Sequence, residues 1–268
     1  MPPNRRQLKD RRKSTCRGIS RDNGIWATWY DLGDGDNSDY FDWLNGEYLP
    51  SLGARPGYAW AAHYKGGTKE GSGMGDVRSR LGRMDDPDIG TGTQYLMLAG
   101  AVEPSTLVAP NVFSDEVELS AEAKKMLSRR VGVRTCLFSV FARVDGPEAG
   151  LRPAGTTPGP VIQMGSFRTR TIEDEYDVCA WYAQHRLPAI ASMPGCIAAR
   201  VMLGAAGWAK FSVLYEFISA EARQKNFEER HEALGESEIP WTHRVHDYTV
   251  HAPGSPTVGT RLWPPVDG

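Results

Sequence analysis

The chain has 268 residues, of which 40% are hydrophobic and 24% are charged, with a formal net charge of −2 at pH 7. This composition provides enough apolar material for a globular core and excludes a wholly disordered chain. Such a small net charge gives no indication of nucleic-acid binding. No apolar run approaches the ~20 residues of a membrane-spanning helix.

Basic residues concentrate at the N-terminus, within residues 1–23, without apolar periodicity. We expect a disordered arm there. No apolar segment typical of a signal peptide follows, and the four cysteines have neither CxxC spacing nor the density of a disulfide scaffold. These features favour a cytoplasmic protein with reduced thiols.

Residues 24–146 predict a first β-α-β-β-α-β unit. Its first strand, Gly24–Leu32, is rich in aromatic residues, and a helix starting at Ser38 or Asp39 follows a turn-forming run. The remaining strands are expected at 58–64, 94–102 and 134–144, and a second helix at 121–129. Residues 65–92 form a glycine-rich, charged insert, which we expect to shape the entrance to a pocket near His63 and Tyr64.

A linker rich in glycine and proline occupies residues 147–160, and residues 161–252 predict a second unit with the same order of elements. Its strands are expected at 161–169, 196–203, 209–218 and 242–251, and its helices at 176–191 and 222–234. The tail, residues 253–268, is expected to be loop-like.

One sequence pattern occurs in both units. W-x5-L-P-x5-P-G starts at Trp43 and again at Trp181, an offset of about 138 residues, and such self-similarity indicates a duplicated module. Each copy predicts a four-stranded antiparallel sheet with both helices on one face, so the other face needs cover. The predicted fold class is therefore α+β, with two ferredoxin-like βαββαβ halves packed sheet to sheet.

The repeated pattern resembles the first helix and following strand of the dimeric α+β barrel superfamily, especially EthD-like proteins with a His-x-x-Pro signature. Here the signature reads His185-Arg186-Leu187-Pro188. The resemblance implies an intramolecular barrel in which one chain is equivalent to the usual homodimer. It also implies a pocket between sheet and helices in each half.

The catalytic candidates follow from the differences between the copies. His185 aligns with Glu47, which suggests a single working site with His185 as general acid or base. The alternative for His185 is a helix-end histidine bonded to a carbonyl. Glu47 is a proton-handling carboxylate if it pairs with Tyr48, Tyr30 or His63, and otherwise a solvated surface residue. Tyr30 and His63 are therefore catalytic candidates as well.

Most aromatic side chains belong to the core, but some are expected to line a cavity for an aromatic or apolar molecule. An arginine there would bind a substrate carboxylate or phenolate. The candidate substrate-binding residues are Trp26, Trp43, Trp181, Arg168 and Tyr215.

His243, His246 and His251 form the one histidine cluster in the sequence. On the strand expected at 242–251, neighbouring members of this set point to opposite faces, which disfavours a shared metal site. We therefore predict no metal.

The predicted function is that of a cofactor-independent enzyme, a lyase, isomerase, cyclase or decarboxylase that performs proton-transfer chemistry on a small aromatic or polyketide-like compound. Two alternatives stay open: a haem-binding barrel protein, since some relatives with this barrel bind haem through a histidine, and a non-catalytic small-molecule-binding module. We expect a monomer or homodimer with no nucleic-acid or membrane partner.

Overall fold

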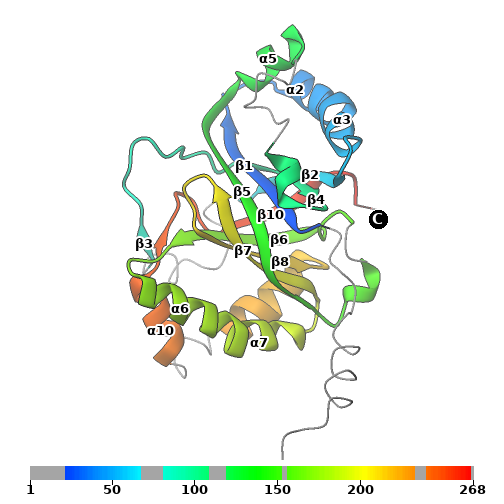
Figure 1. Cartoon of the computed structure of the whole chain (residues 1–268). Coiled ribbons are helices and arrows are strands. Elements are labelled where there is room, and N and C mark those ends of the chain that lie inside the picture. Colours follow the sequence, from blue (N-terminus) through cyan, green and yellow to red (C-terminus); the bar gives the residue numbers. More distant parts are fainter. Residues whose placement is uncertain (1–21, 68–80, 109–118, 153–155, 233–239, 267–268) are drawn as a thin grey trace, which may run out of the picture.

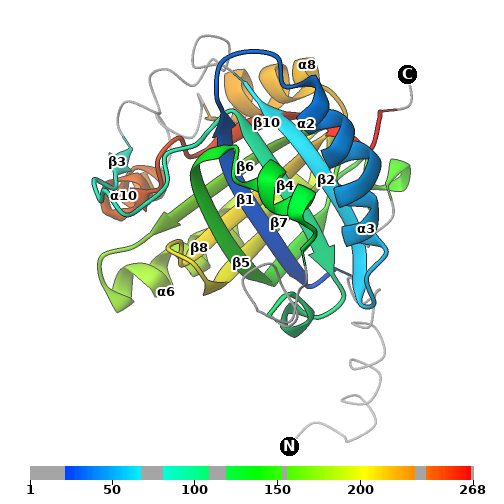
Figure 2. The ribbon, with the colours of Figure 1, turned by 90° about the horizontal axis from the view of Figure 1, so that it is seen from above.

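The computed structural model describes residues 22–67, 81–108, 119–152, 156–232 and 240–266. Antiparallel strands close into an eight-stranded barrel, in the order β10-β2-β4-β1-β5-β7-β8-β6, and β6 pairs back with β10 (Figures 1 and 2). The barrel strands are β1 (Gly24–Leu32), β2 (Tyr58–Gly66), β4 (Tyr95–Ala101), β5 (Arg130–Asp145), β6 (Val161–Arg168), β7 (Cys196–Ala206), β8 (Phe211–Phe217) and β10 (Thr257–Trp263).

The two halves of the chain have the same strand order. The first half is ordered β5-β1-β4-β2 and the second β10-β6-β8-β7. The last strand of each half pairs with the second strand of the other, through the β5–β7 and β10–β2 ladders. This confirms the α+β fold of two ferredoxin-like halves predicted from the sequence. That the halves arose by duplication stays a prediction.

Helices cover the outside of the barrel, with those of the two halves on opposite sides (Figure 1). Within the described residues, no helix is long and apolar enough to cross a membrane. The first half contributes α2 (Ser38–Trp43), η1 (Leu44–Tyr48), α3 (Leu49–Gly53), η2 (Pro104–Leu107) and α5 (Ala121–Leu127). After η3 (Ala149–Leu151), the second half contributes α6 (Ile172–Trp181), η4 (Tyr182–Arg186), α7 (Leu187–Ala191), α8 (Ala220–Ala222), η5 (Arg223–Glu232) and α10 (Pro240–Tyr248).

The C-terminal region differs from the sequence prediction. Residues 242–251 were predicted as a strand and 253–268 as a loop-like tail, whereas the structure has α10, a short strand β9 (Val250–His251) and the barrel strand β10. Pro240 fits the first position of a helix, where its missing N–H costs nothing. Thr242, Val245 and Tyr248 are the buried residues of α10 and recur at helical spacing. The fourth strand of the second half is therefore β10.

The repeated Pro-Gly pair makes the same turn in both halves. Tyr58 N–H donates to the Arg55 carbonyl at 3.1 Å, and Cys196 N–H donates to the Met193 carbonyl at 3.1 Å. Gly57 and Gly195, the third residues of these turns, have φ of 83° and 81°. A turn with proline second and a positive φ third requires glycine at that position, which explains this part of the repeat.

Three apolar layers hold the fold together, one inside the barrel and one under the helices of each half. Neighbouring residues of β2 face different layers, as expected for a strand. Tyr64 belongs to the barrel interior, whereas His63 bonds to Tyr30 on the side of the helices.

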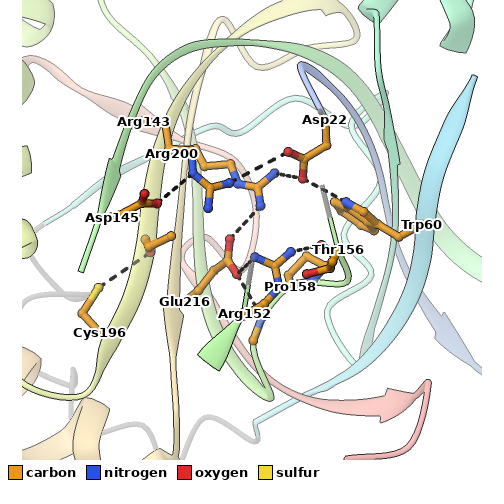
Figure 3. A network of polar contacts seen from close by, with 12 residues as sticks. Asp22, Trp60, Arg143, Asp145, Arg152, Thr156, Pro158, Cys196, Arg200 and Glu216 are labelled. Carbon is orange, nitrogen blue, oxygen red and sulfur yellow. Dashed lines mark hydrogen bonds and ion pairs between the residues drawn. The ribbon is translucent and has the colours of Figure 1, made fainter. Parts of the chain in front are cut away.

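A buried ion network joins the two halves inside one end of the barrel (Figure 3). The Arg200 guanidinium donates to Asp22 Oδ2 at 2.6 Å and to Glu216 Oε1 at 2.8 Å, and all three side chains are fully buried. Arg152 lies 2.7 Å from Glu216 Oε2. The sequence prediction placed Asp22 in the N-terminal arm, whereas in the structure its side chain is fully buried in this network. The rest of that arm, residues 1–21, lies outside the described part of the chain.

Candidate functional site

In each half, the long helix contains a π-helical turn just before a proline. The turn η1 separates α2 from α3, and η4 separates α6 from α7. Pro50 and Pro188 are the second residues of α3 and α7. Proline lacks an N–H and its ring clashes with the carbonyl four residues earlier. A π-turn widens the helix at this point, so the Leu-Pro of the repeat lies within a helix without ending it.

The π-turn decides which side chains face the sheet. Tyr48 and Arg186, at equivalent positions of the two halves, are buried. Glu47, which precedes Tyr48, is exposed, and His185, which precedes Arg186, is half-buried. Glu47 thus matches the alternative of a solvated surface residue. The ring centres of His185 and Trp181 are 6.0 Å apart. Burial, and to a lesser degree the positive charge of Arg186, lowers the pKa of His185. The two helix candidates for proton transfer therefore differ in their exposure, and neither is as deeply buried as the residue that follows it.

A partly enclosed cavity of about 70 Å³ lies between β6, β8 and the helices of the second half. Its walls are mostly aromatic and aliphatic, with a few polar groups, as is usual for small-molecule sites. His185 and Glu47 are not among its lining residues. These are Leu81, Gln163, Gly165, Phe167, Trp181, Tyr182, Arg186, Val213, Tyr215, Val245, His246, Thr249, His251 and Pro256.

Arg186 is held at one end of the cavity by aromatic rings. Its Nε donates to Tyr215 Oη at 3.0 Å, and its guanidinium carbon lies 5.1 Å from the ring centres of both Trp181 and Phe227. Cation–π contacts of this kind orient a guanidinium. The cavity therefore contains an oriented positive charge.

Two histidines lie near the other end. His251 faces Phe167 across the β6–β9 pairing, and its Nε2 lies 3.2 Å from Thr249 Oγ1. Burial, with smaller effects of Arg83 and His246, lowers the pKa of His251 to about 3, so its imidazole is neutral at physiological pH. His246, on α10, is half-buried and lines the same cavity. The helical conformation of this segment removes the strand-based argument against a shared histidine site.

The insert reaches this cavity from the first half. Residues 68–80 lie outside the described residues, but Leu81 is buried and lines the cavity. Next to it, β3 (Gly82–Arg83) pairs in parallel with β9. The insert was predicted to shape a pocket near His63 and Tyr64; its described end instead lies against the second half.

The corresponding layer of the first half contains a buried Tyr30–His63 pair. Tyr30 Oη lies 2.8 Å from His63 Nε2, and the Arg130 guanidinium stacks on the Tyr30 ring at 4.3 Å. Burial, and to a lesser degree Arg130, lowers the pKa of His63 to about 3. The structure thus brings two predicted catalytic residues together. His63 is fully buried, so its ring is not accessible to solvent.

The predicted substrate-binding residues divide between cavity and core. Trp181 and Tyr215 line the cavity. Trp26 and Trp43 pack in the helix-side core of the first half. Arg168 is exposed, and its guanidinium carbon lies 5.1 Å from the centre of the Trp208 ring.

Sequence reasoning missed four lining residues with distinct chemistry: Gln163, Arg186, His246 and Leu81. Arg186 had a signal, because it follows the proposed His185 and aligns with an aromatic residue, Tyr48, in the other copy. Because the equivalent residue of the other copy is a buried aromatic, an arginine at this position indicates a buried side chain with a specific partner rather than a solvated one.

A metal or a haem would need suitable ligands and enough space at this site. Within the described parts of the chain, no group of three or more His, Cys, Asp or Glu residues could hold a metal ion. A haem is larger than the drug-sized ligands that occupy pockets of ~300–1,000 Å³, and the cavity with the histidines measures about 70 Å³. The cavity does not fit a haem.

No family model matches the sequence, and no curated protein sequence matches it. Solved structures share its fold at low identity. An anthrone oxidase-like protein is 12% identical with a TM-score of 0.53, covering 90% of this chain and 92% of the other. A candidate chlorite dismutase is 11% identical with a TM-score of 0.50, covering 90% and 95%.

A candidate monooxygenase from Fusobacterium nucleatum is 7% identical with a TM-score of 0.50, covering 90% of this chain and 93% of the other. At such identities the likeness shows the fold alone. It supports the dimeric α+β barrel expected from the repeat, over nearly the whole chain.

Proposed function

We propose that this chain is a cofactor-independent enzyme that binds a small aromatic molecule in the cavity of the second half and performs proton-transfer chemistry on it. The observation that carries the proposal is the combination of aromatic walls, a fixed guanidinium and two histidines around one cavity. The structural neighbour described as anthrone oxidase-like supports an aromatic ligand, because its name refers to an aromatic compound.

In this proposal His246 is the general acid or base. It lines the cavity while remaining half-buried, so it can exchange a proton with solvent between turnovers. His251 is neutral and buried, and both of its ring nitrogens have protein hydroxyls as partners, so in this proposal it forms part of the cavity wall. The reaction class is that of an isomerase, in which a C–H proton is removed and returned at another carbon, or of a lyase, in which removal of the proton accompanies departure of a leaving group from the neighbouring carbon.

The first half serves as scaffold in this proposal. Its Tyr30–His63 pair is buried in the corresponding layer of that half. We propose folded halves at 22–146 and 161–263, joined by the linker, with one working site. A monomer then contains every residue of that site.

The test is proton exchange in D₂O. The purified full chain is incubated with a panel of small aryl ketones and aryl-substituted acids, and loss of the C–H signal is followed by ¹H NMR. We expect exchange of at least one compound, and we expect His246→Ala to slow it by ~10²- to 10⁴-fold. His243→Ala is the matched control, because His243 is exposed on the same helix.

His185→Ala is expected to keep the exchange rate, because His185 does not line the cavity. Exchange that depends on His185 but not on His246 would contradict this assignment. If a non-catalytic binding module is the correct description, compounds of the panel bind without any exchange.

A further inference from the structure

A second, larger cavity of about 670 Å³ opens at the barrel end that holds the ion network, since Arg152 belongs to both. Its volume lies within the ~300–1,000 Å³ of pockets that bind small molecules. We call it the linker cavity, because much of its wall comes from the segment predicted as a linker, residues 147–160. Its lining residues are Leu151, Arg152, Thr156, Thr157, Gly159, Pro160, Ile197, Ile218, Arg261, Pro264, Pro265 and Val266.

Two guanidinium groups reach the linker cavity from distant parts of the sequence. Arg152 follows η3, and its Nη2 donates to the Thr156 carbonyl (Figure 3). Arg261 belongs to β10, and its Nη1 donates to the Pro158 carbonyl at 2.7 Å. The two side chains thus bond to carbonyl oxygens only two residues apart, which holds their positive charges close to each other.

Positive charges outnumber buried carboxylates at this end of the barrel. Glu216 pairs with Arg152 at 2.7 Å and with Arg200 at 2.8 Å, and Asp22 also pairs with Arg200. Within the described structure, the partners of the Arg261 guanidinium are carbonyl oxygens and not a carboxylate. None of the described lining residues is aspartate or glutamate. The linker cavity therefore has an excess of positive charge.

Both arginines also have a buried donor that is not used. Nε of Arg152 and Nε of Arg261 have no hydrogen-bond partner among the described residues, and Arg152 is only 7% exposed. A buried N–H without an acceptor costs free energy. Burial lowers the pKa of Arg152 to about 10, against the opposing effect of Glu216, so the group stays charged at neutral pH. An anion in the linker cavity would supply the missing acceptors.

The remaining walls of the linker cavity are largely aliphatic. Leu151, Ile218 and Val266 are large apolar side chains at the surface, and Leu151 is 71% exposed. Exposed apolar side chains gathered around a cavity are typical of ligand contact. Unlike the cavity of the second half, this one has no aromatic ring among its described lining residues. Such walls suit an alkyl chain, because they offer no ring on which an aromatic ligand could stack.

We propose that the linker cavity binds the anion of an aliphatic carboxylic acid. Its carboxylate accepts hydrogen bonds from Arg152 and Arg261, since the planar guanidinium fork matches a carboxylate in geometry. Its chain lies over Leu151, Ile218 and Val266. The two cavities share none of their described lining residues, so this inference is independent of the proposed proton-transfer function.

The experiment is calorimetric titration of the full chain with octanoate and with octanamide, its neutral counterpart. We expect octanoate to bind at least about tenfold more tightly, since a charge-assisted hydrogen bond contributes more than a neutral one. Arg261→Met should remove this preference, and Arg261→Lys should restore part of it. The control Arg244→Met, at an exposed arginine of α10, should leave the preference unchanged. Urea unfolding of each variant shows that it is folded.

Leu151→Ser tests the contact with the chain without changing the charge. It should weaken octanoate and octanamide alike, by about threefold or more, because less apolar surface is removed from water. Ile172→Ser is the matched control, because Ile172 is also exposed but does not line the linker cavity. Its affinities should equal those of wild type.

Equal affinity of wild type for octanoate and octanamide, or no binding of octanoate, overturns the inference. Binding that Leu81→Ala weakens and Arg261→Met does not would also overturn it, because that ligand would lie in the cavity of the second half. Octanoate binding that depends on Arg261 and Leu151 supports the inference, whether or not the protein exchanges protons of any aromatic compound. The two proposals can therefore fail separately.

Discussion

His63 Nε2 lies 2.8 Å from Tyr30 Oη, linking two strands of the first half that are separated by β4. The pair is buried, and His63 Nδ1 has no hydrogen-bond partner. Protonation would therefore place a charge where neither water nor a carboxylate compensates it within the described surroundings. Burial is the main reason that the pKa of His63 is lowered to about 3.

This depressed pKa predicts acid sensitivity. Above pH 6.5 the histidine is neutral in both folded and unfolded chains. Between pH 6.5 and about 3 the unfolded chain binds a proton that folded His63 does not. Stability therefore falls with decreasing pH, by about 1.4 kcal/mol per pH unit for this group.

We expect His63→Phe to reduce that slope in urea unfolding measured from pH 5 to 8. Tyr30→Phe removes the same hydrogen bond but keeps the imidazole, so its slope should match that of wild type. Parallel pH profiles for wild type and His63→Phe would contradict the assignment.

Arg200 is predicted to be the most sensitive residue of the buried network. It joins Asp22 and Glu216, and although burial alone raises the pKa of Glu216, Arg200 and Arg152 lower it. Arg200→Met leaves two buried carboxylates without their shared partner, which should cost about 3–5 kcal/mol of unfolding free energy. Urea denaturation measures this.

The comparison is Lys210→Ala, which breaks the Lys210–Glu175 pair, where the lysine is 51% exposed. An exposed pair contributes about 0–1 kcal/mol. Similar losses of unfolding free energy in Arg200→Met and Lys210→Ala would mean that burial does not determine how much an ion pair contributes to stability in this protein.

The sequence predicted the fold well where the pattern depended on local physics. The Pro-Gly turns at Gly57 and Gly195 require glycine, and the alternation of His63 and Tyr64 follows from strand geometry. The shared turn and helix of the two copies therefore predicted the barrel.

The candidate site was harder to predict because its geometry depends on departures from regular helices. His185 was predicted from the His-x-x-Pro resemblance and from its alignment with Glu47, whereas the residue of the π-turn that lines the cavity is Arg186. A regular helical period does not include the extra residue of a π-turn. Thr242–His251 is rich in β-prone residues, yet packing of Val245 and Tyr248 on α6 residues favours a helix. Tertiary contacts of this kind were not visible in one sequence.

The cysteines of the barrel are predicted to be unreactive. Burial raises the pKa of Cys196 to about 12 and also raises that of Cys136, so the nucleophilic thiolate is scarce at neutral pH. In a Cys16→Ser, Cys179→Ser background, we expect Ellman's reagent to react slowly with native protein and rapidly after urea unfolding. Fast reaction of the native variant would show that these thiols are accessible.

Leu81 offers the sharpest test of the insert. It lines the cavity and is 7% exposed, whereas Asp85, four residues later in the same insert, is exposed. Shortening the whole insert would also remove the β3–β9 pairing, so a loss of activity after that deletion would not separate shaping of the cavity from support of the fold. A substitution of Leu81 separates them.

We expect Leu81→Ala to remove about two to three buried methylene equivalents from the cavity wall, each worth ~0.8 kcal/mol of contact with a ring. Affinity for one-ring ligands should fall by about tenfold or more, and the tolerance for larger rings should rise because the wall recedes. Asp85→Ala should alter neither. Calorimetric titration with benzoate and a naphthoate measures both effects, and unchanged affinities in Leu81→Ala would mean that the insert does not shape the ligand site.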